Sequence, residues 1–321
     1  MKAIVQDRYG SADVLHLREL DTPAIGDRDV LVRVRASAVH AGDWHMMTGL
    51  PYLIRFMGFG IRRPKVAVRG SDVAGVVAAV GKDVRQLRPG DEVFGWCDGS
   101  LAEYARAPEG NFLPKPARLT FEQAAAVPIS GIAALQGLRD SGRLKSGQRV
   151  LVTGAAGGVG SFAIQIAKAF GAEVTGVCSS GKVDLVRSLG ADEVIDYTRQ
   201  GSGQRYDLIL DTAGRRPLRI MRRLLKPAGT LVLVGGEGGD RWLGGFQRHL
   251  AAVLLSPFVR HTLRSLYSTE RGTDLAVLKE LIDAGKVTPV IDRTYPLSET
   301  RDALRHLAGG HSRGKTVITV A

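Results

Sequence analysis

The sequence predicts an α/β protein in which a doubly wound parallel sheet is joined to a second, mostly β domain. The chain has 321 residues, more than one ordinary core requires, which suggests about two domains. Apolar strand candidates alternate with helical patterns from about residue 118 to 260, as in a parallel sheet covered on both faces. Residues 150–168 (VLVTGAAGGVGSFAIQIAK) pass from an apolar strand through a glycine-rich turn into a helical pattern.

The first stretch of the chain has the pattern of half-buried strands. Apolar and polar residues alternate along 30–39, which is the period-2 pattern of a strand with one buried face. Further strands are expected at 72–80 and 92–95, where Gly81 and the Pro89-Gly90 turn separate them. This stretch therefore predicts a mostly β domain.

The glycine-rich turn in the middle of the chain indicates a dinucleotide site. Small residues stand where a diphosphate would approach backbone N–H groups and where a helix would lie close to its strand: Gly154, Ala155, Gly157, Gly158 and Gly160. The helix that begins near Val159 would direct the positive end of its dipole at this turn, which favours an anion. The alternative is a tight turn with a purely structural role.

The strands of the parallel sheet are expected at 149–153, 173–177, 193–196, 207–210 and 230–234.

The last stretch is expected to return to the first domain. Helical patterns cover about 274–285 and 298–308, and a strand follows at 315–320. We therefore predict one domain from residues 1–120 and 261–321, and a nucleotide-binding domain from residues 121–260.

Composition and charge exclude some classes of protein. No apolar stretch reaches the roughly 18 to 20 residues of a membrane span, and the first residues lack a signal-peptide pattern, so we expect no membrane association and a cytoplasmic location. The two cysteines, Cys97 and Cys178, form no disulfide framework. The net charge of +12 admits a nucleic-acid or acidic-membrane surface, but the basic residues are spread along the chain, which favours solvated helix faces.

The loop after the second strand of the sheet favours NADPH over NADH. An acidic residue at this place binds the adenosine ribose and repels a 2′-phosphate, but the strand ends at Cys178 without one. The hydroxyls of Ser179 and Ser180, the Lys182 ammonium and the phenol of Tyr197 suit a phosphate. The alternative is that the two serines only cap the following helix.

Seven segments together resemble the medium-chain dehydrogenase/reductase superfamily, in its zinc-independent quinone oxidoreductase branch. They are GSDVAGVVAAVG, PGDEVFG, SLAEYA, AAAVP, VTGAAGGVGSFAIQIAK, LGADEVIDY and RGKTVI, and the likeness runs nearly end to end. The resemblance implies a GroES-like, partly open β-barrel catalytic domain built from both chain ends, with a Rossmann domain between them. It also implies an active site in the cleft, and it implies a dimer or a tetramer, of which we expect a homodimer.

The departures from zinc-dependent relatives predict chemistry without a metal. Ser71 stands where those relatives have histidine, and cysteines are missing near Ala41 and Pro128. His40, Asp43 and His45 lie close in sequence, so an unconventional zinc site stays an alternative. Without a metal, hydride addition to an enone or quinone is favoured, since a delocalised anion needs only a few hydrogen-bond donors.

The resemblance also implies site residues. In the family, an Asn-x-x-Asp segment lies beside the nicotinamide and the substrate. Asp43 matches the aspartate of this segment, whereas His40 stands in place of its asparagine. An equally good alternative is that Asp43 is only the N-cap of a helix. Tyr52, in an apolar loop, is a further proton-donor candidate, and Ala133 replaces a threonine near the nicotinamide. Cofactor contacts are expected at Gly158 and Val159 for the pyrophosphate, and at the following residues for the rest of the cofactor: Val234, Gly235, Gly236, Ser256, Pro257, Phe258 and Lys315.

Three hypotheses of function follow. The first is an NADPH-dependent reductase of quinones or α,β-unsaturated carbonyls. The second is a zinc-free alcohol or ketone oxidoreductase of a biosynthetic pathway. The third, prompted by the charge of +12, is an NADPH-responsive nucleic-acid-binding protein without catalytic activity.

Overall fold

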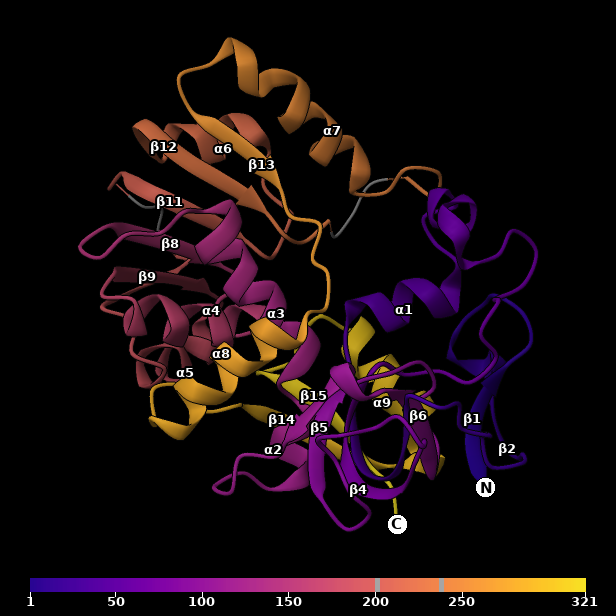
Figure 1. Cartoon of the computed structure of the whole chain (residues 1–321). Coiled ribbons are helices and arrows are strands. Elements are labelled where there is room, and N and C mark those ends of the chain that lie inside the picture. Colours follow the sequence, from indigo (N-terminus) through magenta and orange to yellow (C-terminus); the bar gives the residue numbers. More distant parts are fainter. Residues whose placement is uncertain (200–202, 237–239) are drawn as a thin grey trace. The chain divides into compact units, whose positions relative to one another are not determined.

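The computed structural model describes residues 1–199, 203–236 and 240–321, and the chain divides into two compact units (Figure 1). The first unit is made of Met1–Ser130, Glu270–Asp283 and Pro289–Ala321. The second is made of Gly131–Thr269 and Ala284–Thr288. Both ends of the chain therefore belong to the same unit.

The second unit contains the parallel sheet that the sequence predicts. Its described strands form a six-stranded sheet in the order β10-β9-β8-β11-β12-β13, and every neighbouring pair is parallel. The strand order reverses between β8 and β11, so this pair marks the switch point at which such sheets bind ligands. The strands are β8 (Arg149–Thr153), β9 (Glu173–Cys178), β10 (Glu193–Asp196), β11 (Tyr206–Asp211), β12 (Leu225–Leu233) and β13 (Thr262–Ser265).

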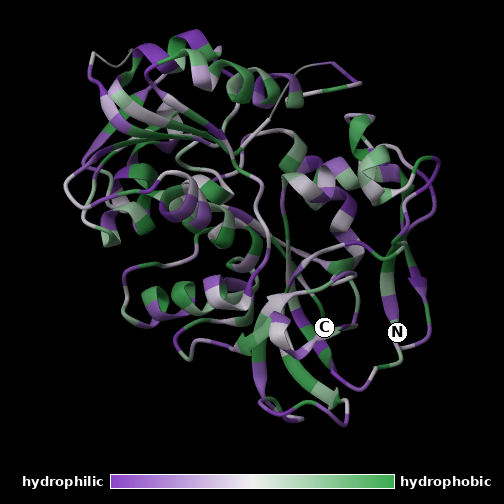
Figure 2. Ribbon diagram, turned by 45° about the horizontal axis from the view of Figure 1, so that its top comes forward, coloured by the Kyte–Doolittle hydropathy of each residue, from purple (hydrophilic) through white to green (hydrophobic). Residues whose placement is uncertain are grey.

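Helices cover this sheet because each has one apolar face. Phe162 and Ile166 of α4 are fully buried, and Met221 and Ala252 contribute from α6 and α7 to a core with Ile209. Figure 2 shows hydrophobic residues along the strands and hydrophobic and hydrophilic residues in succession along the helices. The helical elements are α3 (Pro128–Gln136), η4 (Gly137–Ser141), α4 (Gly158–Ala169), η5 (Ser180–Lys182), α5 (Val183–Ser188), α6 (Leu218–Arg223), α7 (Phe246–Leu255) and η6 (Ser256–Phe258).

The first unit is built around a mainly antiparallel sheet. Its described strands form a seven-stranded sheet in the order β14-β15-β3-β4-β5-β7, with β6 pairing to β3, and only β14 and β15 run parallel. β1 and β2 form a separate hairpin. The strands are β1 (Lys2–Gln6), β2 (Leu15–Glu19), β3 (Asp29–Val39), β4 (Asp72–Val80), β5 (Glu92–Trp96), β6 (Tyr104–Pro108), β7 (Phe112–Pro114), β14 (Ile291–Pro296) and β15 (Lys315–Thr319).

Short helices complete the first unit. The alternation predicted for 30–39 is observed in β3, where Val30, Val32 and Val34 are buried in the core. Helices α8 and α9 lie close to where the sequence predicts them, and β15 pairs with β3 in the same sheet. The helical elements are η1 (Ala12–Val14), α1 (Ala41–Thr48), η2 (Arg55–Phe59), η3 (Glu109–Asn111), α2 (Phe121–Ala125), α8 (Gly272–Asp283), η7 (Leu297–Glu299) and α9 (Thr300–Ala308).

The unit boundary near residue 270 differs from the domain boundary predicted at 260/261. The difference arises from β13, which pairs in parallel with β12 through Leu231 and Leu263 and so completes the sheet of the second unit. At the other boundary, α2 and the start of α3 belong to the first unit. None of the described helices is long and apolar enough to cross a membrane.

Candidate functional site

The glycine turn after β8 has the geometry of a phosphate cradle. Gly154 adopts a left-handed conformation, with a φ of 62°, and its carbonyl accepts a hydrogen bond of 2.9 Å from the Gly157 N–H. A Cβ on Gly160 would lie 2.1 Å from the same carbonyl oxygen, so α4 can approach the turn this closely only with glycine there. The sequence requirement for small residues thus has a direct steric cause.

The first turn of α4 is left open to a ligand. The N-cap residue of α4 is Gly157, so no side chain of the described residues caps the helix. The N–H groups of Gly158 and Val159 belong to the first turn, which has no partners within its own helix, and the helix dipole adds positive potential. The Ala155 N–H donates to Val177 O (3.1 Å) and fixes the turn to β9. These residues fit a dinucleotide pyrophosphate.

An acid that the sequence pattern did not reveal lies beside the loop that follows β9. Parallel pairing sets Asp196 of β10 opposite Cys178. The Ser180 hydroxyl donates to Asp196 Oδ2 at 2.6 Å, and hydrogen bonds from Ser180 and Thr198 hold the pKa of the Asp196 carboxyl below its usual value. The Asp196 carboxylate at the end of β10 therefore lies next to the loop that holds the predicted hydroxyls and lysine. Sequence reasoning missed Asp196 because it searched for an acid at the end of β9, whereas Asp196 ends the next strand, β10.

The other residues predicted at this loop are close to one another. The Tyr197 N–H donates to Cys178 O (3.1 Å), and the Tyr197 side chain is exposed. Helix α5 begins after Lys182, and neither Ser179 nor Ser180 caps it; Ser179 precedes the short η5 and makes no side-chain cap there. The alternative of two capping serines is therefore wrong.

The carboxyl ends of β11 and β12 form a second group within this unit. The N–H groups of Val234 (3.0 Å) and Gly235 (3.2 Å) both donate to Asp211 O, so the predicted segment 234–236 lies at this edge of the sheet. Asp211 is buried, and its Oδ1 accepts a hydrogen bond of 2.5 Å from the Thr153 hydroxyl. The ends of β8 and β11 are thus joined at the switch point.

Helix α7 brings two further polar residues to this edge. Arg248 forms an ion pair with Asp211 Oδ2, and His249 Nδ1 lies 2.6 Å from Ser265 Oγ at the end of β13. Burial lowers the pKa of His249. Neither residue carries a local sequence signal, because both stand in an ordinary amphipathic helix far from the glycine turn.

The segment predicted to close over the cofactor lies elsewhere. Ser256, Pro257 and Phe258 form η6 after α7, and Ser256 Oγ accepts from the Leu263 N–H near the amino end of β13. Since β13 runs parallel to β12, α7 must carry the chain back from the carboxyl edge before β13 begins. Phe258 is 85% exposed there. The segment therefore lies away from the carboxyl edge of the sheet, and the prediction that it contacts the cofactor is corrected.

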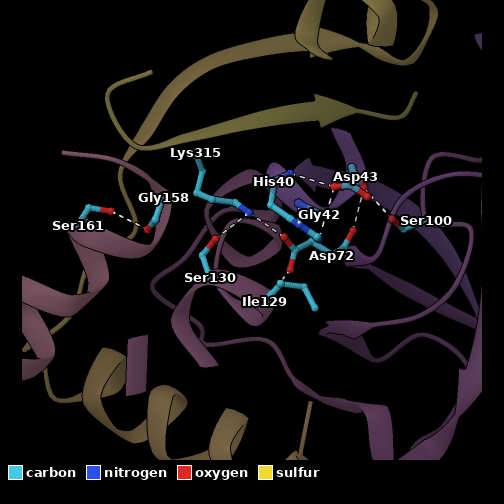
Figure 3. Close-up of polar contacts among 11 residues, drawn as sticks. His40, Gly42, Asp43, Asp72, Ser100, Ile129, Ser130, Gly158, Ser161 and Lys315 are labelled. Carbon is cyan, nitrogen blue, oxygen red and sulfur yellow. Dashed lines mark hydrogen bonds and ion pairs between the residues drawn. The ribbon is translucent and has the colours of Figure 1, made fainter. Parts of the chain in front are cut away.

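In the first unit, His40 and Asp43 together begin helix α1 (Figure 3). The Gly42 N–H donates to His40 Nδ1 (3.0 Å), and the His40 N–H donates to Asp43 Oδ2 (2.9 Å). The N-cap is thus His40, and Asp43 occupies the third helical position of a capping box instead of the N-cap itself. Because Nδ1 accepts, a neutral imidazole carries its proton on Nε2, which lies 3.4 Å from Asp43 Oδ2.

Tyr52 follows α1 in an apolar loop. Its ring is stacked under the Arg55 guanidinium, 4.7 Å from the ring centroid, and it is partly exposed. The same loop exposes Phe56, Met57 and Phe59. A phenolic donor and an apolar surface therefore occur together near α1.

Lys315 is engaged in a buried network instead of presenting a free charge (Figure 3). Its Nζ lies 2.8 Å from Asp72 Oδ2 and 3.2 Å from Ser130 Oγ, and Asp72 Oδ1 accepts the Ile129 N–H at 2.8 Å. The two charged side chains are 2% and 0% exposed. This corrects the predicted phosphate contact of Lys315, because the ammonium holds the start of α3.

The histidine and cysteine side chains near α1 and β5 were compared with the ligand set of a zinc site. Among the described residues no group of three His, Cys, Asp or Glu side chains converges. His45 Nδ1 is bonded to Leu50 O (2.8 Å), and burial raises the pKa of the Cys97 thiol far above its usual value.

Comparison with known proteins identifies two family domains and full-length relatives. Residues 26–117 match the alcohol dehydrogenase GroES-like domain, and residues 189–318 match the zinc-binding dehydrogenase family. The chain is 35% identical to the mitochondrial NAD(P)H oxidoreductase RTN4IP1 of Mus musculus, over 100% of this chain and 89% of that protein.

Other relatives carry names of reductases. The 2-methylene-furan-3-one reductase of Solanum lycopersicum is 35% identical, over 99% of this chain and 79% of that protein. Among solved structures, the quinone oxidoreductase from Coxiella burnetii is 28% identical and has a TM-score of 0.86, with 100% of this chain and 99% of that chain covered.

Proposed function

This chain belongs to the medium-chain dehydrogenase/reductase superfamily, in its quinone oxidoreductase branch, and on that premise we propose that it reduces a quinone or an α,β-unsaturated carbonyl compound with NADPH and without zinc. The observation that carries the proposal is the uncapped first turn of α4 behind Gly154 and Gly160, whose N–H groups suit a dinucleotide pyrophosphate. Relatives named as quinone, alkenal and furanone reductases support the substrate class.

The chemistry of the donor set supports conjugate reduction. Alcohol oxidation requires an alkoxide, which a metal or a strong base would have to stabilise, and the described residues offer no three-ligand cluster for a metal. Bound NADPH supplies a hydride. Reduction of an enone or quinone then leaves a delocalised anion, which a few hydrogen-bond donors stabilise.

The first unit supplies candidate donors with different roles. His40 Nε2 is enclosed by protein and its Nδ1 is committed to Gly42, so we assign His40 and Asp43 the role of fixing the start of α1. We propose that the Tyr52 phenol or water delivers the proton to the substrate anion, since this side chain is partly exposed beside an apolar surface.

A substrate panel tests this function directly. Purified protein with NADPH is expected to lose the reduced-nicotinamide absorbance when enones or quinones are added, and to show no reduction of NADP⁺ with simple alcohols. Heat-inactivated protein is the control. Turnover of aldehydes without turnover of enones would favour the zinc-free alcohol or ketone oxidoreductase instead.

The preference for NADPH is tested at Lys182. Its ammonium stands in the loop after β9, and loss of one charge-assisted hydrogen bond to a 2′-phosphate is expected to weaken NADPH binding roughly 10- to 100-fold in Lys182→Ala, with NADH binding unchanged. Isothermal titration of both cofactors measures this. Lys168→Ala is the matched control, because that ammonium pairs with Asp192 in the same unit. Equal binding of the two cofactors by the unmodified protein would contradict the preference.

Assembly and location stay predictions. A homodimer is supported by apolar side chains that α7 leaves exposed, namely Leu250, Val253 and Leu254. The comparisons do not support the predicted cytoplasmic location, because several relatives are named as mitochondrial or chloroplastic proteins.

A further inference from the structure

Arg248 is a charged side chain whose donors outnumber its partners. Its side chain is 14% exposed and forms an ion pair with Asp211, whose own side chain is 2% exposed. Nη2 lies against Asp211 Oδ2, whereas Nε and Nη1 are shielded from solvent and have no hydrogen-bond partner among the described residues. A guanidinium carries five N–H donors, and leaving buried donors without acceptors costs free energy. An oxygen-rich ligand that met this group would therefore satisfy donors that the described residues leave unpaired.

The place of Arg248 in the sheet identifies the chemistry of that ligand. Its anchor, Asp211, ends β11 at the switch point of the strand order. A dinucleotide bound across this point sets its adenosine half over β8, β9 and β10 and its second half over β11, β12 and β13. The pyrophosphate then meets the first turn of α4, and the nicotinamide ribose and carboxamide face the ends of β11 and β12. These groups offer hydroxyl, phosphate and carbonyl oxygens.

His249 supports the same edge from the next position of α7. Its ring is hydrogen-bonded to Ser265 Oγ at the end of β13 and to the backbone of Gly235 at the end of β12. A Cβ on Gly245, just before α7, would lie 2.2 Å from Gly236 O, so the start of the helix is packed directly on this turn. α7 therefore joins the ends of all three strands on the nicotinamide side.

We propose that Arg248 is a cofactor-binding residue which donates hydrogen bonds to the nicotinamide half of NADPH, and that His249 is a positioning residue which holds the Gly235–Gly236 turn for it. This inference rests on the proposed function and deepens it. Asp211 orients the guanidinium and compensates its charge. The adenosine half of the cofactor makes no contact with this group.

Two ligands separate the halves of the site. Isothermal titration with NADPH and with adenosine 2′,5′-bisphosphate, which represents the adenosine half alone, is carried out on Arg248→Met. We expect NADPH binding to weaken roughly 10- to 100-fold and adenosine 2′,5′-bisphosphate binding to stay unchanged. Arg223→Met is the matched control, since Arg223 is an exposed arginine at the end of α6 in the same unit and should leave both affinities unchanged.

A second variant separates loss of NADPH binding from loss of folding. Arg248→Lys keeps a positive charge beside Asp211 but removes the planar set of donors, so it should melt near the unmodified protein and still lose most of the NADPH-specific affinity. Unchanged NADPH binding in Arg248→Lys and Arg248→Met, or equal weakening of both ligands, overturns the inference and leaves Arg248 as a structural tether. If the unmodified protein binds neither ligand, the proposed function itself has failed.

Discussion

Replacing Lys315 with methionine is expected to lower the free energy of unfolding of the first unit by about 3–5 kcal/mol. The Lys315 ammonium lies 2.8 Å from Asp72 Oδ2 with both side chains almost completely buried. Removing the cation leaves the Asp72 carboxylate without its counter-ion in a site that water does not reach. Asp72 also accepts the Ile129 N–H at the start of α3. Without Lys315, this acceptor is no longer held in place, so the start of α3 is weakened as well. Urea denaturation followed by circular dichroism measures the change.

A surface ion pair provides the matched control. Lys82→Met breaks the pair between Lys82 and Asp27, whose side chains are 72% and 63% exposed, and should cost less than about 1 kcal/mol. The double variant Asp72→Asn/Lys315→Met should recover part of the loss, because no uncompensated charge remains buried. Unchanged stability of Lys315→Met together with weaker NADPH binding would restore the phosphate contact that the sequence suggests for Lys315.

Local patterns predicted the features that neighbouring residues determine. The glycine turn, the strands β8 and β9 and the helix α4 follow from apolar periodicity and steric requirements within about 30 residues, and the structure has them where the pattern indicates. The strand β13 escaped this reasoning because its four residues bury a single apolar side chain, Leu263, and become a strand only by pairing with β12.

The polar network could not be predicted because its partners are distant in sequence. Asp72 and Lys315 are 243 positions apart and meet only once β15 and β4 join the same sheet. Asp196 reaches Ser180 through the pairing of β9 with β10, and Arg248 reaches Asp211 through the packing of α7. In each case the residue type was visible in the sequence, whereas its partner, and therefore its role, depended on tertiary structure.

Gly160→Val is expected to weaken NADPH binding more than about 100-fold, because two or more charge-assisted hydrogen bonds from the α4 turn would be displaced together. A Cβ at this position would lie 2.1 Å from Gly154 O and 2.8 Å from Gly154 C. Both are backbone atoms of the turn that follows β8, so no side-chain rotation relieves the overlap. The first turn of α4 must then move away from the residues that cradle the pyrophosphate.

The size of this loss distinguishes a ligand site from a structural turn. Overpacking alone costs roughly 1–3 kcal/mol of stability, which a thermal melt of Gly160→Val records separately from titration with NADPH. Gly203→Val is the matched control in the same unit, since a Cβ there meets no atom of the described part of the chain within 4 Å. If Gly160→Val is destabilised but binds NADPH with unchanged affinity, the close approach of α4 to β8 serves only the packing of the sheet. Loss of binding in the folded variant instead means that the missing side chain at residue 160 is what allows the backbone of α4 to reach the cofactor.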